Sequence, residues 1–534
     1  MLKYVLYGLP CSGKTTLMNE VSIPVIHGSK ILNDMLSGSF SQLSNDEKNK
    51  LRIEYTQMLS CRSDTFISDG HYSFLDDVVF TQNDGDLYDV FLYLYCEPKV
   101  ILKRFQVSSK NSRFAYLSEE SIYKWQNYEI ESLRSECHDR CKDFYVVRDI
   151  SSDELQFFIC KINKGYSSYS IAVGIADKIM RNYPTPCEVH ICDGDKTIIT
   201  QDSFRLCTDN YVTNIFDGGF YTGYQSFAFS KETAGLDYNV NKLSDIYIND
   251  TVYDMVRDKN YVILSSGITS LWERIASRLG LKNVVADTNI SADTKYFVVR
   301  ILQDNGYSVT AYGDGRNDYY MLKQADTGYL YIGSYLSRSL RKTDLSGISL
   351  LYDKSPFILS EVDDTLFDDI AICKSGSGIN GSKLADAHNR LGKKLGEVMN
   401  TFIPSTGTAV IVLERGGRFF GDGIYTGFGG TFYAYNPKKD KLPKIQHSAA
   451  VIVDSVINTG NSVLATIEKI KEDNPDIDIV IAVNVIQEKA FKVLNEYKVF
   501  AIRTSQNSFV GNRQAVQKDG KGPDTADRLY NYIR

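Results

Sequence analysis

The sequence has no run of 18 apolar residues, the length that a helix needs to span a membrane, so it predicts no membrane-spanning helix. Its first residues, MLKYVLYGLP, are a short strand-like stretch that leads directly into a motif, and we expect no signal peptide. A strong excess of charge is also lacking. The net charge is −6 over 534 residues, which does not indicate a general polyanion-binding surface.

Cysteine is too sparse for a disulfide framework. Ten cysteines are spread over the chain and none follows Cys373, so we expect reduced thiols and a cytoplasmic location. One cluster, CHDRC at 137–141, places two thiols at positions i and i+4 of an expected helix. A structural zinc needs four ligands, and no second Cys/His pair accompanies this one. We therefore interpret the cluster as ordinary helix positions.

A phosphate-binding motif lies near the start of the chain. The predicted strand 2–6 is followed at once by GLPCSGKT at 8–15, which fits G-x-x-x-x-G-K-[ST] and opens a helix. In such a loop, backbone N–H groups hold the β-phosphate, the lysine reaches the β- and γ-phosphates, and the last hydroxyl binds Mg²⁺. The phosphate-binding residues predicted here are Gly8, Gly13, Lys14, Thr15 and Thr16, with Thr15 as the magnesium ligand.

The following residues resemble a P-loop nucleoside or nucleotide kinase. A predicted strand ends at Asp69, which is placed to hold the magnesium hydration shell or to act as base on an acceptor hydroxyl. The alternative for Asp69 is a simple Asp–Gly turn. A core strand at 88–95 leads into a helix, and the resemblance places Arg104 and Arg113 in a lid over the transferring phosphoryl group. For each arginine the alternative is a solvated surface charge. The resemblance implies ATP as donor and leaves the acceptor open.

Two aspartates follow the predicted strand 189–192, in the segment DGDKT. Carboxylates at this spacing can divide a phosphoryl transfer between them, because Asp193 can attack phosphorus while Asp195 protonates the leaving oxygen. Further segments follow in order: a strand ending in SSG at 265–267, Lys295 at the start of a helix, and a strand ending in GDGRND at 313–318.

These four motifs resemble those of the haloacid dehalogenase superfamily. The resemblance implies that Ser265 binds the phosphoryl group and that Lys295 neutralises the nucleophile and the phosphate. It implies a magnesium site among Asp193, Asp195, Asp314 and Asp318. Carboxylate, carbonyl and water oxygens suit this ion. The second aspartate indicates a phosphatase or phosphotransferase rather than a dehalogenase, and residues 201–260 resemble a small specificity cap.

A second phosphate-binding pattern lies in the last third of the chain. A predicted strand at 451–453 ends on Asp454, a turn NTGNS follows at 458–462, and a helix begins. A helix start offers free N–H groups and partial positive charge, and a carboxylate just before it suits ribose hydroxyls. The ligand-binding residues predicted here are Asp454, Asn458, Thr459, Gly460, Asn461 and Ser462.

This segment resembles the 5-phosphoribosyl-1-pyrophosphate (PRPP) loop of type I phosphoribosyltransferases. With RGGRFFGDG at 415–423 and GPDTADRLY at 522–530, the resemblance narrows to the uracil phosphoribosyltransferase type. It implies that Arg415 lies by the pyrophosphate and that Asp524 lies near magnesium or the base. The chain departs from the pattern at Glu414, at Asn461 and at 518–521, so uracil as the base stays open.

Together these patterns predict three doubly wound α/β domains with parallel sheets, at 1–165, 166–340 and 341–534. We predict a multifunctional enzyme of nucleotide metabolism that uses Mg²⁺, ATP and PRPP on nucleotide, nucleoside or base substrates, with a homodimer through the last domain by analogy. One alternative is a polynucleotide 5′-kinase/3′-phosphatase for end repair, with nucleic acid as its partner. Another is that one domain, the third before the others, is a catalytically inactive binding module.

Overall fold

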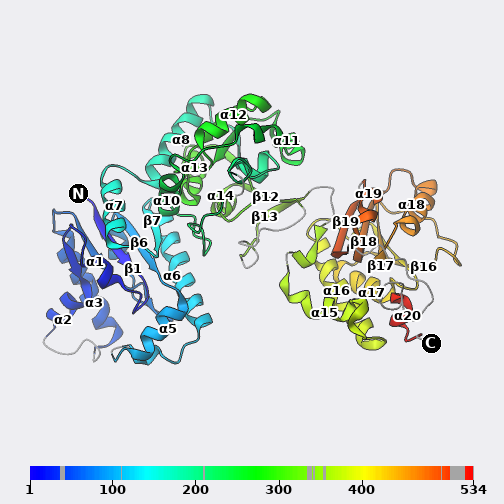
Figure 1. The fold of residues 1–534 in the computed structure, drawn as a ribbon, viewed down its shortest axis with the longest axis horizontal. Helices are drawn as coiled ribbons and strands as arrows, with labels where there is room; N and C mark the ends of the chain where they lie inside the picture. Colours follow the sequence, from blue (N-terminus) through cyan, green and yellow to red (C-terminus); the bar gives the residue numbers. More distant parts are fainter. Residues whose placement is uncertain are drawn as a thin grey trace. The chain divides into compact units, whose positions relative to one another are not determined.

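The structure is a computed structural model. It describes residues 1–36, 43–109, 111–208, 211–333, 340, 343–352, 357–361, 363–494, 496–505 and 524–532. The chain forms two compact units, Met1–Tyr329 and Leu330–Arg534. Three sheets with parallel strands and flanking helices follow one another along the chain, and the predicted α/β class is confirmed (Figure 1). The predicted domain limits stay predictions. Within the described residues, no helix combines the length and apolar character needed to cross a membrane.

The first sheet has the strand order β2-β3-β1-β6-β7, with every pair parallel. Its strands are β1 (Lys3–Tyr7), β2 (Val25–His27), β3 (Phe66–Asp69), β6 (Val90–Tyr95) and β7 (Asp143–Arg148). Strand β6, VFLYLY, is buried along its whole length, as expected where helices cover both faces of a parallel sheet. Because β1 is central, the loop after it opens at the carboxyl edge beside the ends of β3 and β6.

Helices and one small hairpin complete this region. The helices are α1 (Lys14–Met18), α2 (Gly28–Asp34), α3 (Asn45–Ser60), α4 (Gln82–Leu87), α5 (Pro98–Val107), α6 (Glu119–Asp139) and α7 (Ser152–Asn163). The antiparallel pair is β4 (Ser73–Phe74) and β5 (Asp77–Val78).

The second sheet has the order β10-β9-β8-β11, followed by β12 and β13. Its strands are β8 (Glu188–Cys192), β9 (Tyr261–Ser265), β10 (Val284–Ala286), β11 (Ser308–Gly313), β12 (Thr327–Gly333) and β13 (Ile348–Tyr352). The helices are α8 (Ser168–Asn182), α9 (Ser203–Cys207), α10 (Gly223–Thr233), α11 (Asp250–Val256), α12 (Thr269–Leu279), α13 (Ala292–Asp304) and α14 (Tyr319–Gln324). Strands β9, β8 and β11 are parallel neighbours, so the loops after them converge.

The third sheet has the order β14-β19-β18-β17-β15-β16, with parallel pairs throughout. Its strands are β14 (Phe357–Ile358), β15 (Thr408–Leu413), β16 (Thr431–Tyr435), β17 (Ala449–Ile457), β18 (Asp478–Gln487) and β19 (Lys498–Ser505). The helices are α15 (Phe367–Cys373), α16 (Ser382–Met399), α17 (Arg418–Phe428), α18 (Asn461–Asp473), α19 (Glu488–Leu494) and α20 (Thr525–Leu529).

Helices α16 and α17 cross at backbone contact through glycines. A Cβ atom on Gly392 would lie 2.2 Å from the carbonyl oxygen of Phe420, and one on Gly423 would lie 2.1 Å from the carbonyl oxygen of Asn389. No side chain fits at such distances without moving a helix. This crossing fixes helix α17, which begins directly after the loop that contains Arg415.

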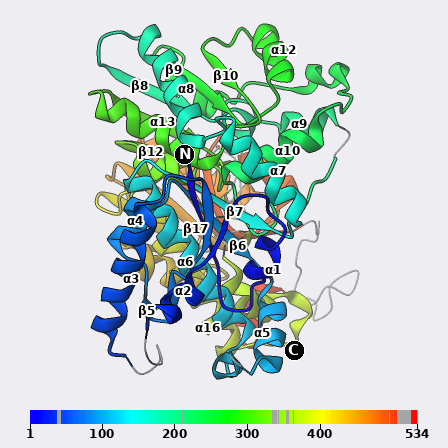
Figure 2. The ribbon, with the colours of Figure 1, turned by 90° about the vertical axis from the view of Figure 1, so that its left-hand side faces the viewer.

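The predicted cap packs on the first sheet. Helix α10 lies beside the edge strand β7 in both views (Figure 1, Figure 2). The backbone N–H of Val146 donates to Thr222 Oγ1 at 3.1 Å, and Gln225 Nε2 donates to the Val146 carbonyl at 2.9 Å. Phe220 belongs to the aromatic core of the first sheet, with its ring 4.9 Å from that of Tyr95. The first region and the second as far as Tyr329 therefore share one compact unit.

Candidate active sites

Three carboxylates and one lysine meet at the carboxyl edge of the second sheet. Asp193 follows β8, Asp314 follows β11, and Asp318 precedes α14; their carboxylate oxygens lie within 4.8 Å of one another. The fully buried Lys295 of α13 places Nζ 2.5 Å from Asp193 Oδ1 and 2.7 Å from Asp318 Oδ1. The structure thus brings Asp193 together with Asp314 and Asp318, which are more than 120 positions away in the sequence.

The charges of this cluster do not balance. Burial, and then the charge of Asp318, raise the pKa of Asp193 to about 7, against the opposing effect of Lys295. Burial, and then the charges of Asp318 and Asp193, raise the pKa of Asp314 well above its ordinary value. Burial alone would lower the pKa of Lys295, but Asp193 and Asp318 raise it. Lys295 pairs with two of the three carboxylates, and the charge of Lys196 acts on the third, Asp314. Three carboxylates whose oxygens lie this close together suit a divalent ion with oxygen ligands.

Asp195 lies beside this cluster with a different partner. Its Oδ1 accepts a 2.7 Å hydrogen bond from the backbone N–H of Ser203. Burial, and next the charge of Asp202, raise the pKa of Asp195 to about 6, which is closer to neutral pH than the ordinary value of an aspartate and therefore suits proton transfer. The three aspartates whose oxygens lie close enough together to bind one metal ion are Asp193, Asp314 and Asp318; Asp195 is not among them. The role of Asp195 as a magnesium ligand stays a prediction from sequence.

Ser265 ends strand β9 next to the loop that carries Asp193. It is buried, and its Oγ accepts a 3.0 Å hydrogen bond from the backbone N–H of Gly267. A Cβ atom on Gly194 would lie 2.9 Å from Ser265 Oγ and 2.3 Å from the ring of Trp272. The glycine after Asp193 therefore lets the two loops touch.

The P-loop after β1 has positive φ angles at two glycines, a conformation that other residues rarely adopt. Gly8 and Gly13 have φ values of 150° and 106°, and Gly13 caps helix α1. Lys14 Nζ donates to the carbonyl oxygens of Gly8 and Leu9, at 2.5 and 3.1 Å. Burial lowers the pKa of Lys14 to about 8, although nearby carboxylates oppose the shift. Thr15 and Thr16 are exposed at the start of α1.

An open cleft of about 1610 Å³ contains the predicted kinase residues. Its lining includes Gly13, Lys14, Thr15, Thr16, Asp69, Arg104 and Arg113. Asp69 accepts a hydrogen bond from the backbone N–H of Gly28 at 2.8 Å. Arg104 donates to the carbonyl oxygens of Cys11 and Ser12, at 2.9 and 3.1 Å, so it is held by the P-loop itself. The guanidinium carbon of Arg113 lies 4.6 Å from the ring centre of Phe114.

In the third sheet, the loop with Arg415 lies against Asp454. A Cβ atom on Gly416 would lie 3.8 Å from Asp454 Oδ1, and Ser455 Oγ donates to the Gly416 carbonyl at 2.5 Å. Burial raises the pKa of Asp454 to about 7, and Asp524 adds to this while backbone hydrogen bonds oppose it. The Arg415 side chain is 56% exposed and pairs with Asp527 at 3.0 Å.

The predicted PRPP loop differs from expectation in one respect. Strand β17 continues through Asp454 to Ile457, so this aspartate lies inside the strand and not at its end. Gly460, with φ 83°, caps helix α18, and Thr459, Asn461 and Ser462 are exposed around its start. Asp524 caps α20 by accepting from the Ala526 N–H at 2.9 Å. The departures at 518–521, together with Gly522 and Pro523, lie outside the described residues.

The sequence did not indicate a buried polar group that contacts Ser455, the residue after Asp454. His388 of α16 lies with its Nδ1 3.3 Å from Ser455 Oγ and 3.4 Å from Asn484 Nδ2. Burial, then Arg528 and Arg503, lower the pKa of His388 to about 3. A lone histidine on an amphipathic helix gives no sequence signal for such a role.

Comparisons with known proteins match these regions in part. The family model described as uracil phosphoribosyltransferase matches residues 435–531. That segment is similar to this family. The match includes the PRPP-loop residues and Asp524 and begins after the Arg415 loop. No curated protein matches the chain.

Solved structures match single regions. A shikimate kinase from Acinetobacter baumannii is 12% identical, with 30% of this chain and 92% of that chain covered and a TM-score of 0.24. A phosphoserine phosphatase, as a phospho-aspartyl intermediate analogue, is 16% identical, with 28% and 87% covered and a TM-score of 0.22. Orotate phosphoribosyltransferase from Mycobacterium tuberculosis H37Rv is 15% identical, with 22% and 71% covered and a TM-score of 0.19.

Proposed function

We propose that this chain is a multifunctional enzyme of nucleotide metabolism. It combines ATP-dependent phosphoryl transfer, Mg²⁺-dependent phosphate ester hydrolysis and PRPP-dependent transfer of phosphoribose to a base, with pyrimidines as the first candidates. The observation that carries the proposal is that the residues of each motif set meet at the carboxyl end of a parallel sheet, where α/β enzymes bind their ligands.

The phosphatase reaction follows from the cluster around Lys295. A carboxylate oxygen of Asp193 attacks phosphorus, the ester P–O bond breaks, and Asp195 gives its proton to the leaving oxygen. Asp195 then takes a proton from water, whose oxygen attacks the aspartyl phosphate, and phosphate leaves as Asp193 is restored. Lys295 offsets the charge on Asp193. A magnesium ion bound by Asp193, Asp314 and Asp318 would supply further positive charge for the phosphoryl oxygens.

The kinase reaction uses the cleft of the first sheet. An acceptor hydroxyl attacks the γ-phosphorus of ATP, Asp69 takes the hydroxyl proton, and the bond to the β-phosphate oxygen breaks. Lys14 exchanges its two carbonyl partners for the β- and γ-phosphates. Because a kinase and a phosphatase with the same target would cancel each other, we propose that they act on different positions or intermediates.

The phosphoribosyl transfer uses the third sheet. A ring nitrogen of the base attacks the anomeric carbon of PRPP, the bond to pyrophosphate breaks, and the proton of that nitrogen passes to water. The turn at 458–462, in which Thr459, Asn461 and Ser462 are exposed, receives the 5-phosphate at the start of α18, and Asp454 receives the ribose hydroxyls. Arg415 leaves Asp527 for the pyrophosphate, which its 56% exposure permits.

Pyrophosphate release from PRPP with Mg²⁺ tests the third activity, over a panel of free pyrimidine and purine bases. Release with one base, lost in Asp454→Asn, supports it and identifies the base. No release with any base would reduce this region to a binding module. Product profiles with Lys14→Met, Asp193→Asn and Asp454→Asn test the combination, and unchanged products in all three variants would contradict it.

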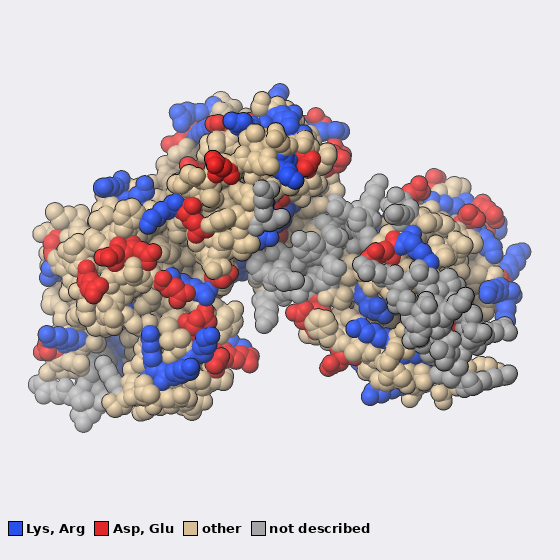
Figure 3. All heavy atoms as spheres, viewed as in Figure 1, with Lys and Arg blue, Asp and Glu red and all other residues tan. Residues whose placement is uncertain are grey.

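A second candidate function is nucleic-acid end repair. The observation in its favour is that the P-loop and phosphatase-like regions share one compact unit, which the third sheet does not join. Against it, positive and negative side chains are interspersed among the described residues on the face in Figure 3. ATP-dependent labelling of a 5′-hydroxyl oligonucleotide, lost in Lys14→Met, would favour this candidate.

A further inference from the structure

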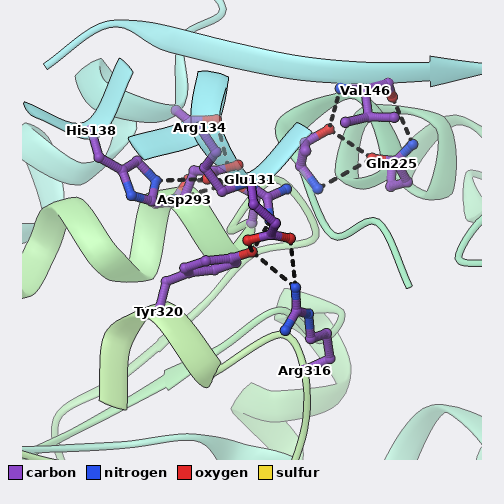
Figure 4. Close-up of polar contacts among 12 residues, drawn as sticks. Glu131, Arg134, His138, Val146, Gln225, Asp293, Arg316 and Tyr320 are labelled. Atoms are coloured by element: carbon purple, nitrogen blue, oxygen red, sulfur yellow. Dashed lines mark hydrogen bonds and ion pairs between the residues drawn. The ribbon is translucent and has the colours of Figure 1, made fainter. Parts of the chain in front are cut away.

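Helix α6 of the P-loop region contacts the loop that carries two magnesium-site aspartates. Arg316 donates to Glu131 Oε1 at 2.7 Å, and the Tyr320 hydroxyl donates to Glu131 Oε2 at 2.5 Å (Figure 4). Arg134, one turn along α6, donates to the Tyr320 hydroxyl at 2.5 Å. Arg316 and Tyr320 lie two residues before and two residues after Asp318. Helix α6 therefore holds both sides of this metal-site residue.

The same helix also holds the segment that carries Lys295. Asp293, two residues before Lys295, is almost fully buried and accepts a 2.8 Å hydrogen bond from His138 Nε2 (Figure 4). Arg134 Nε lies 3.3 Å from the same Asp293 oxygen. The His138 ring stacks on Tyr296, with ring centres 3.8 Å apart. Both parts of the phosphatase-like cluster are thus anchored on one helix of the neighbouring region.

These anchors matter because the aspartates repel one another. The loop between Asp314 and Asp318 is closed by two backbone N–H groups that donate to Asp318 Oδ2, each at 3.2 Å. Asn317 adds a 2.8 Å bond to Ser266 Oγ. The contacts of Arg316 and Tyr320 with α6 set where the closed loop points. Mutation of residues that hold metal ligands in place, without binding the metal themselves, typically lowers metal affinity or activity by about 10–100-fold.

We propose that Glu131 is a positioning residue of the phosphatase site, supplied by the P-loop region. The inference rests on the proposed phosphatase function. Glu131 touches no reacting atom; it acts through Arg316 and Tyr320 on the position of Asp314 and Asp318. Its loss lets the loop turn and weakens magnesium binding, and it leaves Asp193 and Asp195 in place.

The test measures hydrolysis of p-nitrophenyl phosphate by the full chain as a function of Mg²⁺ concentration. For Glu131→Ala we expect the half-saturating Mg²⁺ concentration to rise about tenfold, with the KM for p-nitrophenyl phosphate at saturating Mg²⁺ within about twofold of wild type. Glu131→Gln keeps an acceptor for Tyr320 and should show a smaller rise. Arg316→Ala should add little to Glu131→Ala, because both remove the same contact.

Glu120→Ala is the matched control. Glu120 lies on the same helix, is 73% exposed, and pairs with Lys124 of that helix. Equal Mg²⁺ dependence in wild type, Glu120→Ala and Glu131→Ala would overturn the inference alone. Wild-type hydrolysis no greater than that of Asp193→Asn would overturn the phosphatase function and this inference with it. If Glu131→Ala does not fold, Glu131→Gln carries the same measurement, and an unchanged Mg²⁺ dependence in it overturns the inference.

Discussion

The side-chain amide of Gln225 donates to the main-chain carbonyl of Val146, at 2.9 Å, and so places helix α10 along β7, the edge strand of the first sheet. Thr222 completes the contact by accepting from the Val146 N–H at 3.1 Å. An edge strand presents unpaired backbone groups that must be covered or paired. In this protein both groups of Val146 are paired by side chains from another region.

Gln225→Ala should lower the unfolding free energy of the first unit by about 1–3 kcal/mol, because the buried Val146 carbonyl loses its donor. Urea unfolding of the full chain measures this. Gln57→Ala, at an exposed position of α3, is the control and should change stability by less than about 0.5 kcal/mol. Equal stability of the two variants would show that the contact contributes nothing.

Gly392→Ala should destabilise the third sheet's unit by about 1–3 kcal/mol, since its new methyl group would meet the Phe420 carbonyl at 2.2 Å. The Arg415 loop precedes the displaced helix α17, so PRPP-dependent activity should fall as well. Thermal unfolding and pyrophosphate release measure the two effects. Gly376→Ala is the control, because a Cβ atom there meets nothing within 4 Å. A wild-type melting temperature for Gly392→Ala would contradict the prediction.

Lys14→Met should reduce ATP-dependent phosphoryl transfer at least about 100-fold, because in the proposed reaction the Lys14 charge binds the β- and γ-phosphates. Hydrolysis of p-nitrophenyl phosphate should stay within about twofold of wild type. In wild type, kcat/KM for ATP should fall above pH 8, since the pKa of Lys14 is lowered to about 8 and the lysine loses its charge as the pH rises through that value. A profile that is flat from pH 7 to 9 would contradict this.

His388 should make the third sheet's unit acid-sensitive. Its pKa is lowered from 6.5 to about 3 by burial and by Arg528 and Arg503, so between these values the unfolded chain binds a proton that the folded chain does not. Unfolding free energy contributed by His388 is therefore complete above pH 6.5 and falls by about 1.4 kcal/mol per pH unit towards pH 3. Ser455 and Asn484, its neutral neighbours, do not titrate in this range.

Urea unfolding at pH 7 and pH 5 measures that effect in wild type and in His388→Asn. Wild type should lose about 1–2 kcal/mol more than the variant over this interval. Asp454 is present in both proteins, so its own titration cancels in the comparison. An equal loss in the two proteins would show that His388 does not bind the proton.

The sequence predicts best where one short segment carries both the backbone geometry and the chemistry. Gly13 and Lys14 lie in one loop, and Asp193 directly follows strand β8. A local sequence pattern therefore locates the P-loop and the first aspartate of the metal cluster. Asp454 was expected at a strand end, but the β-branched residues after it extend β17 to Ile457.

Contacts between distant segments were not predictable. Residues 137–141 indicate ordinary helix positions, and an amphipathic pattern does not identify what covers the buried face. In the structure His138 bonds to Asp293, a residue 155 positions away. The sequence does not indicate the contacts of Glu131 either, because a half-exposed glutamate on a long helix resembles any surface charge.

Aromatic residues of helix α10 and of the segment before it cover the first sheet, and this has a consequence for folding during synthesis. Phe220 packs in one core of the P-loop region, and Tyr224 and Phe227 pack against the other. On the ribosome, residues 1–165 emerge before this cover exists. At 5–20 residues per second, the remaining 62 residues up to Phe227 take roughly 3–12 s. During that interval the edge of β7 and the apolar surface beside it are open, and we expect chaperones to bind the nascent chain there.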